Sequence, residues 1–285
     1  FCNQIFIFMK SIKILLASLI LIFSITSYSQ DECGFAPNAE MVKILDLEWT
    51  LNKETYLRSE NHLRNEWIEL PITIHSNVEG NSNDLTLFEN ALIQLNKNFE
   101  SAKIKFTTCR ILNDKSIPTS VNTFGYSSNR FHYFSRKNIP YSINIYIVDR
   151  LSSDGGFTYI SGVATLPFSS NIPHIVIKRD ALATNVLTHE MGHYLGLYHT
   201  FGPNNACQVQ DELVNGTNCE YAGDRICDTP ASPCCSGVVD ANCIYFGTKT
   251  DKNGESFTPD VSNFMEYTLD KCRTNFTPEQ ILKMR

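Results

Sequence analysis

The chain has 285 residues, a length that suits one or two domains. Hydrophobic residues make up 42% of the chain and charged residues 19%, which is the balance of an ordinary globular protein. The formal net charge is −6 and no long basic run occurs, so the sequence gives no indication of a nucleic-acid partner.

The first segment has the composition of an export signal. A short basic stretch, Met9–Lys13, precedes the almost wholly apolar run Ile14–Ile25, and the small residues of Ser27–Ser29 follow. The apolar run is shorter than the ~20 residues that span a bilayer, so a signal peptide is favoured over a membrane anchor. We therefore expect residues 1–29 to hold upstream residues and a signal peptide that starts at Met9. The mature protein is expected to be secreted, with no membrane segment.

Hydrophobic periodicity predicts a sheet with a helix packed on it. Residues 30–67 form a polar, charged lead-in with little core periodicity after Trp49, and the pattern changes beyond them. Alternating apolar residues favour strands, and apolar residues three and four positions apart favour a helix. Gly162 and Pro167 argue that the strand around them lies at an edge. The strands are expected at 67–75, 103–111, 142–148, 159–168 and 172–178, the helix at 83–99, and a loop at 113–140.

Two further helices are expected. The first starts near residues 181–185 and ends at Gly196, because a glycine can adopt the positive φ that stops a helix. The chain then becomes irregular and rich in cysteine. Thr277 as N-cap and Pro278 as the first helical residue predict a last helix. The sequence stops at Arg285 inside that helix, which leaves open a continuation of the natural protein.

One eleven-residue string, H-E-M-G-H-Y-L-G-L-Y-H, starts at His189 and predicts a zinc site. Positions i and i+4 share a helix face, so His189 and His193 can bind one ion. Glu190 then lies beside the open coordination position, where it can take a proton from the zinc-bound water. The turn at Gly196 brings His199 back as the third ligand. Histidines that are merely buried or exposed would not need the glycine and the third histidine.

Ten cysteines agree with export. Seven of them lie between Cys207 and Cys272, which in a secreted chain predicts disulfides across a loop-rich region. A second structural metal is the alternative, but Cys234 and Cys235 are adjacent and no C-x-x-C pair occurs. Spacing alone leaves the connectivity open.

The zinc string resembles that of the metzincin metalloproteases, which also need a methionine turn beneath the metal. Ser262–Tyr267, S-N-F-M-E-Y, fits this turn. Together with H-T-F from His199, C-D-T-P from Cys227 and N-F-T-P-E-Q from Asn275, it is similar to the pappalysin family, in particular its smaller cytophagalysin- and ulilysin-like members. The resemblance covers residues 68–285. It implies an α+β, zincin-like fold: a twisted, mostly parallel sheet with a backing helix and an active-site helix, above an irregular, disulfide-linked lower subdomain.

The resemblance also implies a role for each site residue. Met265 would form the hydrophobic floor under the metal, although core packing also explains a methionine there. Tyr267 would stabilise the tetrahedral intermediate by a hydrogen bond, and a buried structural tyrosine is the alternative. The zinc ligands would be His189, His193 and His199, with Glu190 as the general base.

Disulfides and a calcium site are further implications of the family. Asp224, Asp228 and Thr229 carry oxygen ligands of the right hardness for Ca²⁺, although acidic residues in a solvated loop are the alternative. The implied disulfides are Cys227 with Cys272, Cys207 with Cys234 or Cys235, and Cys219 with Cys243.

Latency is the last implication. Cys33 lies just past the expected signal cleavage, in the lead-in, where a thiolate can occupy the fourth position on zinc. A disulfide between Cys33 and Cys109 is the alternative. We therefore expect residues 30–67 to be a propeptide and residues 68–285 to be the catalytic domain.

The sequence thus predicts a secreted zinc metalloendopeptidase, made as a latent proenzyme, that acts on proteins or peptides. A zinc hydrolase of non-peptide amides would keep the same ligands. A catalytically idle zinc-binding module would not need Glu190. Substrate is expected to pair with the edge strand near 162–167. In 268–272, Lys271 can cancel the charge of Asp270, so no strict preference for cutting before basic residues is expected.

Overall fold

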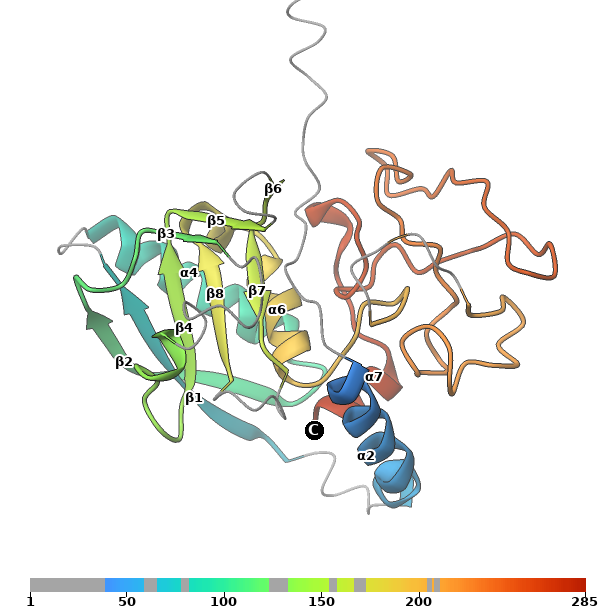
Figure 1. The fold of residues 1–285 in the computed structure, drawn as a ribbon, viewed down its shortest axis with the longest axis horizontal. Coiled ribbons are helices and arrows are strands. Elements are labelled where there is room, and N and C mark those ends of the chain that lie inside the picture. The colour runs from blue at the N-terminus through green and yellow to red at the C-terminus, as the bar shows by residue number, and fades with distance from the viewer. Residues whose placement is uncertain are drawn as a thin grey trace, which may run out of the picture. The chain divides into compact units, whose positions relative to one another are not determined.

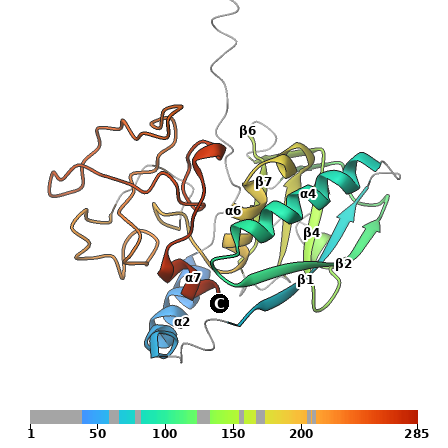
Figure 2. The ribbon, with the colours of Figure 1, turned by 180° about the vertical axis from the view of Figure 1, so that it is seen from behind.

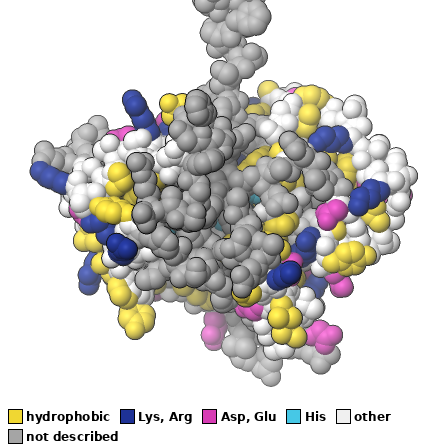
Figure 3. Space-filling view, viewed as in Figure 1, with side chains coloured by type: hydrophobic (Ala, Val, Ile, Leu, Met, Phe, Trp, Pro, Cys, Tyr) yellow, Lys and Arg dark blue, Asp and Glu magenta, His cyan; other side chains and the backbone are white. Residues whose placement is uncertain are grey.

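The computed structural model describes residues 39–58, 66–77, 82–122, 133–153, 158–166, 173–203, 207 and 211–285. All of these belong to the unit Asp31–Arg285. The expected signal peptide and Cys33 lie outside the described residues. No helix in the described part of the chain has the length and apolar character of a membrane span. On the face shown in Figure 3, the described Lys and Arg side chains are scattered among Asp and Glu side chains.

A five-stranded sheet forms the first large part of the fold (Figure 1). Its strand order is β2-β1-β4-β8-β7. The four parallel strands and the antiparallel edge strand are β1 (Ile68–Ser76), β2 (Ile104–Asn113), β4 (Ile143–Val148), β8 (His174–Lys178) and β7 (Gly162–Ala164). Every residue of the central strand β4, I-N-I-Y-I-V, is buried, as expected for a parallel strand covered on both faces. The predicted mostly parallel sheet is confirmed, although β7 is shorter than the edge strand expected at 159–168.

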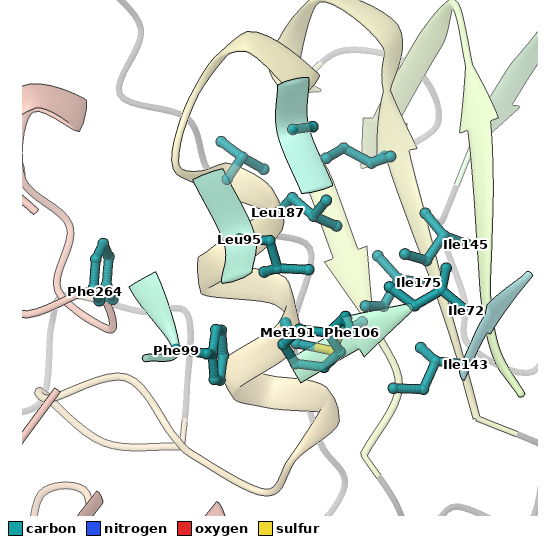
Figure 4. Packing of buried hydrophobic residues seen from close by; sticks show 14 of the residues in the cluster. Ile72, Leu95, Phe99, Phe106, Ile143, Ile145, Ile175, Leu187, Met191 and Phe264 are labelled. Atoms are coloured by element: carbon teal, nitrogen blue, oxygen red, sulfur yellow. The ribbon is translucent and has the colours of Figure 1, made fainter. Parts of the chain in front are cut away.

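Helix α4 (Ser82–Asn98) covers one face of this sheet (Figure 2). Its buried residues Phe88, Ala91 and Leu95 recur at intervals of three and four, which places them on one side of the helix. They join a core that also contains side chains of the strands and of the following helix, α6 (Val186–Tyr194) (Figure 4). Full burial of each large aliphatic side chain contributes about 1.5–3 kcal/mol, so this core anchors α6 firmly on the sheet.

A small second sheet lies mostly in regions that the sequence did not mark as strands, and only its last residue, Tyr159, falls within the strand expected at 159–168. It has the order β3-β5-β6, with β3 (Ser120–Asn122), β5 (Arg150–Ser153) and β6 (Thr158–Tyr159). β3 falls within the loop expected at 113–140. Strands of two to four residues contain too few positions for an alternating pattern to be recognised.

Helix α2 (Ala39–Arg58) was not predicted. Its buried residues Leu45 and Trp49 are one helical turn apart, and the Trp49 indole N–H donates to the carbonyl of Arg225 at 3.1 Å. Lys53 forms an ion pair with Glu279 at 2.9 Å. The helix is therefore packed against the C-terminal part of the chain. Its apolar stripe is narrow and surrounded by charged residues, which is why periodicity alone did not reveal it.

Residues 195–285, called here the turn region, contain little regular structure. Their described elements are a short 3₁₀ helix, η3 (Asp270–Cys272), the helix α7 (Pro278–Met284) and isolated β-bridges. Helix α7 starts as predicted: the Thr277 hydroxyl accepts from the Gln280 N–H, and Gln280 returns a bond to the Thr277 N–H. We call residues 66–194, which hold the sheets, α4 and α6, the sheet region.

Three disulfides crosslink the turn region. One joins Cys207 to Cys234, which is one of the two partners expected for Cys207. The other two correct the expectation, because Cys219 pairs with Cys227 rather than with Cys243, and Cys272 pairs with Cys243 rather than with Cys227. A backbone turn brings the first of these pairs together: Gly223 and Arg225, at φ of +53° and +67°, fold the chain back between Cys219 and Cys227. Cys235, also expected in a disulfide, is a buried free thiol, and Cys109 is free and exposed.

Candidate metal centre

Helix α6 is fixed at both ends by its sequence. At the start, the Asn185 N–H donates to the Asp270 carboxylate at 2.6 Å, and a negative charge is favourable at a helix N-terminus. At the end, Gly196 has φ of +96°, and the N–H of Leu197 bonds back to the carbonyl of Gly192 at 3.0 Å. The chain therefore leaves the helix in a sharp turn that returns residues 197–199 beneath it.

This turn brings the three predicted ligands together. The Nε2 atoms of His189, His193 and His199 form a triangle with sides of 3.1, 3.1 and 3.3 Å. A tetrahedral zinc ion with Zn–N bonds of about 2.0–2.1 Å needs nitrogens about 3.3 Å apart. Among the described residues, this is the one group of three or more potential ligands close enough to hold a metal ion. The geometry and the donor set therefore fit zinc.

The outer nitrogens of two ligands are held by backbone carbonyls. Nδ1–H of His189 donates to the carbonyl of Phe264 at 2.7 Å, and Nδ1–H of His193 donates to that of Leu197 at 2.7 Å. Because a carbonyl can only accept, each bond fixes the tautomer whose Nε2 lone pair points into the triangle. The carbonyl of Phe264 belongs to the methionine turn, so that turn orients a ligand on α6.

Burial keeps all three ligands neutral. It lowers the pKa of His193 to about 3, and it also lowers the pKa values of His189 and His199 well below the usual 6.5. The charges of the neighbouring imidazoles lower the pKa values of His189 and His199 further. Neutral imidazole is the form that binds a metal ion.

Glu190 is fully buried on α6 next to the ligands, where the edge strand approaches the helix. At Gly162 of β7, a Cβ atom would lie 2.7 Å from Cγ of Glu190 and 2.8 Å from its Oε1. Only a glycine lets the strand pass this close without displacing the carboxylate. In the sequence, Gly162 served merely as a sign of an edge strand, and this contact was missed.

The methionine turn lies directly below the histidines. A Cβ at Gly192 would lie 2.4 Å from the sulfur of Met265, so this methionine packs against the glycine face of α6. The ring of Tyr267 contacts that of His199 edge to face, with centroids 4.6 Å apart, and Phe201 stacks on His199 at 4.8 Å and also contacts Tyr267 at 5.0 Å. Met265 and Tyr267 thus adjoin the histidine triangle, the place that the resemblance implied for them.

The proposed calcium ligands are only partly brought together. Asp224 is fully buried, and burial raises the pKa of its carboxyl, an effect that the nearby Lys283 ammonium and the Thr229 hydroxyl oppose. Asp228 is exposed and instead accepts the Glu279 N–H at the start of α7 at 2.8 Å. Glu212, which was not recognised in the sequence, is buried close to Asp224. Its pKa is raised to about 9, first by burial and then by the charge of Asp224.

The fold and this site together define a metzincin: a helix that carries two histidines, a glycine turn to a third, and a methionine turn beneath them. The chain belongs to peptidase family M43, the family of pregnancy-associated plasma protein-A. The model of this family matches residues 125–285, which are more than half of the chain.

Relatives of known name agree with this assignment. An extracellular metalloprotease of Arthroderma gypseum is 34% identical over 98 residues, which are 34% of this chain and 27% of the relative. Another, of Colletotrichum graminicola, is 33% identical over 133 residues, or 47% of this chain and 40% of the relative. The chain thus matches less than half the length of each.

A solved structure shares the fold. A mutant form of promirolysin of Tannerella forsythia is 17% identical and superposes with a TM-score of 0.52. The match covers 89% of this chain and 92% of that one. The similarity extends beyond the residues that the family comparison matches, so the N-terminal strands belong to the same fold.

Proposed function

We propose that this protein is a secreted, zinc-dependent metalloendopeptidase that is made as a latent proenzyme. The observation that carries the proposal is the triangle of Nε2 atoms with sides of 3.1 to 3.3 Å, formed by neutral imidazoles beside the carboxylate of Glu190. Membership of a peptidase family and relatives named extracellular metalloproteases support the reaction class and the location.

His189, His193 and His199 would hold the zinc ion. A zinc ion held there would polarise the scissile carbonyl and lower the pKa of the attacking water. Glu190 would take a proton from the attacking water and deliver it to the leaving amine. The phenol of Tyr267, whose ring packs on His199, donates a hydrogen bond to the developing oxyanion.

Proteins or peptides are the proposed substrates. β7 is one of the two edge strands of the sheet and passes next to Glu190. An extended peptide that pairs with β7 would therefore present its carbonyl groups to the metal site. Asp270 already accepts from the Asn185 N–H and from Arg273 at 3.0 Å, which supports the expectation that it does not select substrates with a basic residue after the cut.

Latency is proposed to rest on Cys33, which lies outside the described residues. Its thiolate would occupy the fourth position on zinc, and residues 30–67 would be the propeptide of a catalytic domain at 68–285. Cys109, the alternative partner, is free. Cys33→Ala should give a proenzyme that cleaves casein before processing. Thiol mapping that finds Cys33 bonded to Cys109 in the active protein would rule the switch out.

A calcium ion bound by Asp224, Thr229 and Glu212 is also part of the proposal. Among the described residues, one carboxylate oxygen of Glu212 and one of Asp224 are buried without a hydrogen-bond partner. Burying such groups is costly, and a hard cation with oxygen ligands offsets the cost. Calcium should therefore raise the melting temperature of the parent but not that of Asp224→Asn. An equal rise in both would place the ion elsewhere.

The decisive experiment is Glu190→Gln, compared with His193→Ala. Glu190→Gln should retain zinc, because Glu190 is not a ligand, and should lose about 10²–10⁴-fold in casein hydrolysis. His193→Ala should lose both zinc and activity. Glu190→Gln that hydrolyses casein as fast as the parent would disprove the assigned mechanism. A parent that cleaves small amides but no casein would favour the non-peptide hydrolase.

A further inference from the structure

A buried carboxylate lies inside the methionine turn, between Met265 and Tyr267. Glu266 is fully shielded from solvent, and both of its oxygens accept hydrogen bonds. Oε1 accepts from the Tyr267 N–H at 2.8 Å and from the Cys235 N–H at 3.1 Å. Oε2 accepts from the Thr200 hydroxyl at 2.6 Å and from the Ser232 hydroxyl. Four donors therefore converge on one side chain.

These four donors come from three separate segments of the turn region. Tyr267 belongs to the methionine turn itself, Thr200 follows the third histidine, and Ser232 and Cys235 belong to the loop that Cys207–Cys234 crosslinks. Glu266 is thus the point at which the three segments are joined. A carboxylate suits this position, because it has two oxygens and about four acceptor sites and needs no donor of its own.

The bond to Thr200 links Glu266 to the metal site. Thr200 directly follows His199, and its N–H donates to the carbonyl of Met265 at 3.2 Å. The residue next to the ligand is therefore held twice by the methionine turn, once through its backbone and once through its hydroxyl. Tyr267, whose own N–H binds Glu266, packs its ring against His199 at 4.6 Å. Ligand and tyrosine are thus oriented from the same carboxylate.

We propose that Glu266 is a positioning residue of the metal site, which fixes His199 through Thr200 and fixes Tyr267 through its N–H. This inference rests on the proposed function, because it assigns the three histidines to a zinc ion. A histidine ligand that lies on a turn lacks the support that α6 gives to His189 and His193. The hydrogen bonds of Glu266 replace that support.

Two hydroxyls on the same oxygen provide a matched test. Thr200 and Ser232 are equally buried and both donate to Oε2 of Glu266, but only Thr200 adjoins a ligand. Thr200→Val removes one hydroxyl and keeps the shape of the side chain. Ser232→Ala removes the other and also removes the acceptor of the Cys234 N–H at 3.1 Å, so it perturbs the loop at least as much. Thr200→Ser restores the hydroxyl.

Three quantities should be measured on the whole protein: zinc affinity by competition with a chromophoric chelator, kcat and KM on casein peptides, and melting temperature. Thr200→Val should lower zinc affinity by about 10–100-fold and lower kcat more than it changes KM. Ser232→Ala and Thr200→Ser should bind zinc as the parent does, even where Ser232→Ala lowers the melting temperature as much as Thr200→Val.

If Thr200→Val matches both Ser232→Ala and the parent in zinc affinity and kcat, the inference is overturned, because Glu266 would then act on stability alone. Failure of Thr200→Ser to restore zinc affinity would overturn it as well. A parent protein that binds no zinc is a different result, since it would overturn the proposed function itself.

Discussion

The sheet region and the turn region reach a fixed structure by different means. In the sheet region, apolar side chains from β1, β4, β8, α4 and α6 pack into one core. In the turn region, buried polar side chains bond to individual backbone groups, and disulfides close the loops. Burial stabilises without direction, whereas a hydrogen bond fixes one atom relative to another. The apolar core of the sheet region therefore supplies rigidity, and the hydrogen bonds and disulfides of the turn region orient individual side chains.

The metal site lies where the two regions meet. His189, Glu190 and His193 are on α6, which rests on the core of the sheet, whereas His199, Met265 and Tyr267 come from the turn region. The interface is itself mixed. Phe99 of the sheet region packs on Phe276 at 5.0 Å, while Asn185 binds Asp270 by hydrogen bonds.

Removing the metal should break the link between the regions and have the largest effect. A chelator should abolish casein hydrolysis completely. Zinc at about 1,000 times its dissociation constant stabilises the folded state by about 4 kcal/mol, and this contribution should be lost from the free energy of unfolding. Activity assays and thermal unfolding, with and without chelator, measure both. Zinc added back should restore both quantities, and sustained hydrolysis by the chelated protein would contradict the prediction.

Ile145→Ala tests the role of burial in the sheet region. Ile145 is fully buried in β4, so the truncation should cost about 2–5 kcal/mol of unfolding free energy. The kcat of the molecules that remain folded should stay near the parent value, because the Ile145 side chain does not orient any individual residue of the metal site. Ile111→Ala is the control, since Ile111 is on β2 and 51% exposed. If urea unfolding shows equal losses of unfolding free energy for Ile145→Ala and Ile111→Ala, the assigned role of burial in the sheet region is wrong.

Removal of one disulfide tests the role of crosslinks in the turn region. Replacing both Cys243 and Cys272 by serine should cost about 2–4 kcal/mol. It should also lower kcat, because Cys272 ends η3, whose Asp270 binds the start of α6. Cys109→Ser, at a free exposed thiol, should leave both melting temperature and kcat unchanged. A double variant that melts at a lower temperature but keeps the parent kcat would show that η3 does not orient α6.

The smallest effect is expected at the helix cap of α7. Thr277→Ala removes the hydroxyl that accepts the Gln280 N–H and should cost about 1 kcal/mol. Thr277→Ser keeps that acceptor and should melt near the parent temperature. Since the Gln280 side chain of α7 keeps its hydrogen bonds to Asn263 of the methionine turn in both variants, neither variant should change zinc affinity. A measurable loss of zinc affinity in Thr277→Ala would mean that α7 helps to hold the metal site.

The sequence predicted the sheet region better than the turn region for the same physical reason. Burial leaves a periodic trace, so the strands around Ile72 and Ile145 and the helix around Leu95 could be recognised from the spacing of apolar residues. The two histidines on α6 could be recognised as a pair because helical geometry fixes the distance between positions i and i+4.

Hydrogen bonds between distant segments leave no such trace. Nothing in the sequence around Glu266 indicates that this side chain is buried, because its hydrogen-bond partners other than the adjacent Tyr267 are 31 or more residues away. Disulfide partners were mistaken for the same reason. Cys219 and Cys227 are joined by a turn that depends on two residues with positive φ, and spacing alone cannot specify that.

The docking of α2 has a consequence for how the protein is made. Trp49 binds the carbonyl of Arg225, 176 residues later in the chain, and its ring faces the Lys283 ammonium at 5.4 Å. A ribosome adding about 5–20 residues per second needs on the order of 10–50 s to travel from α2 to that lysine. Throughout this time the apolar stripe of α2 is synthesised but has no place to pack. The helix can therefore dock in this way only after the chain has been synthesised as far as Lys283.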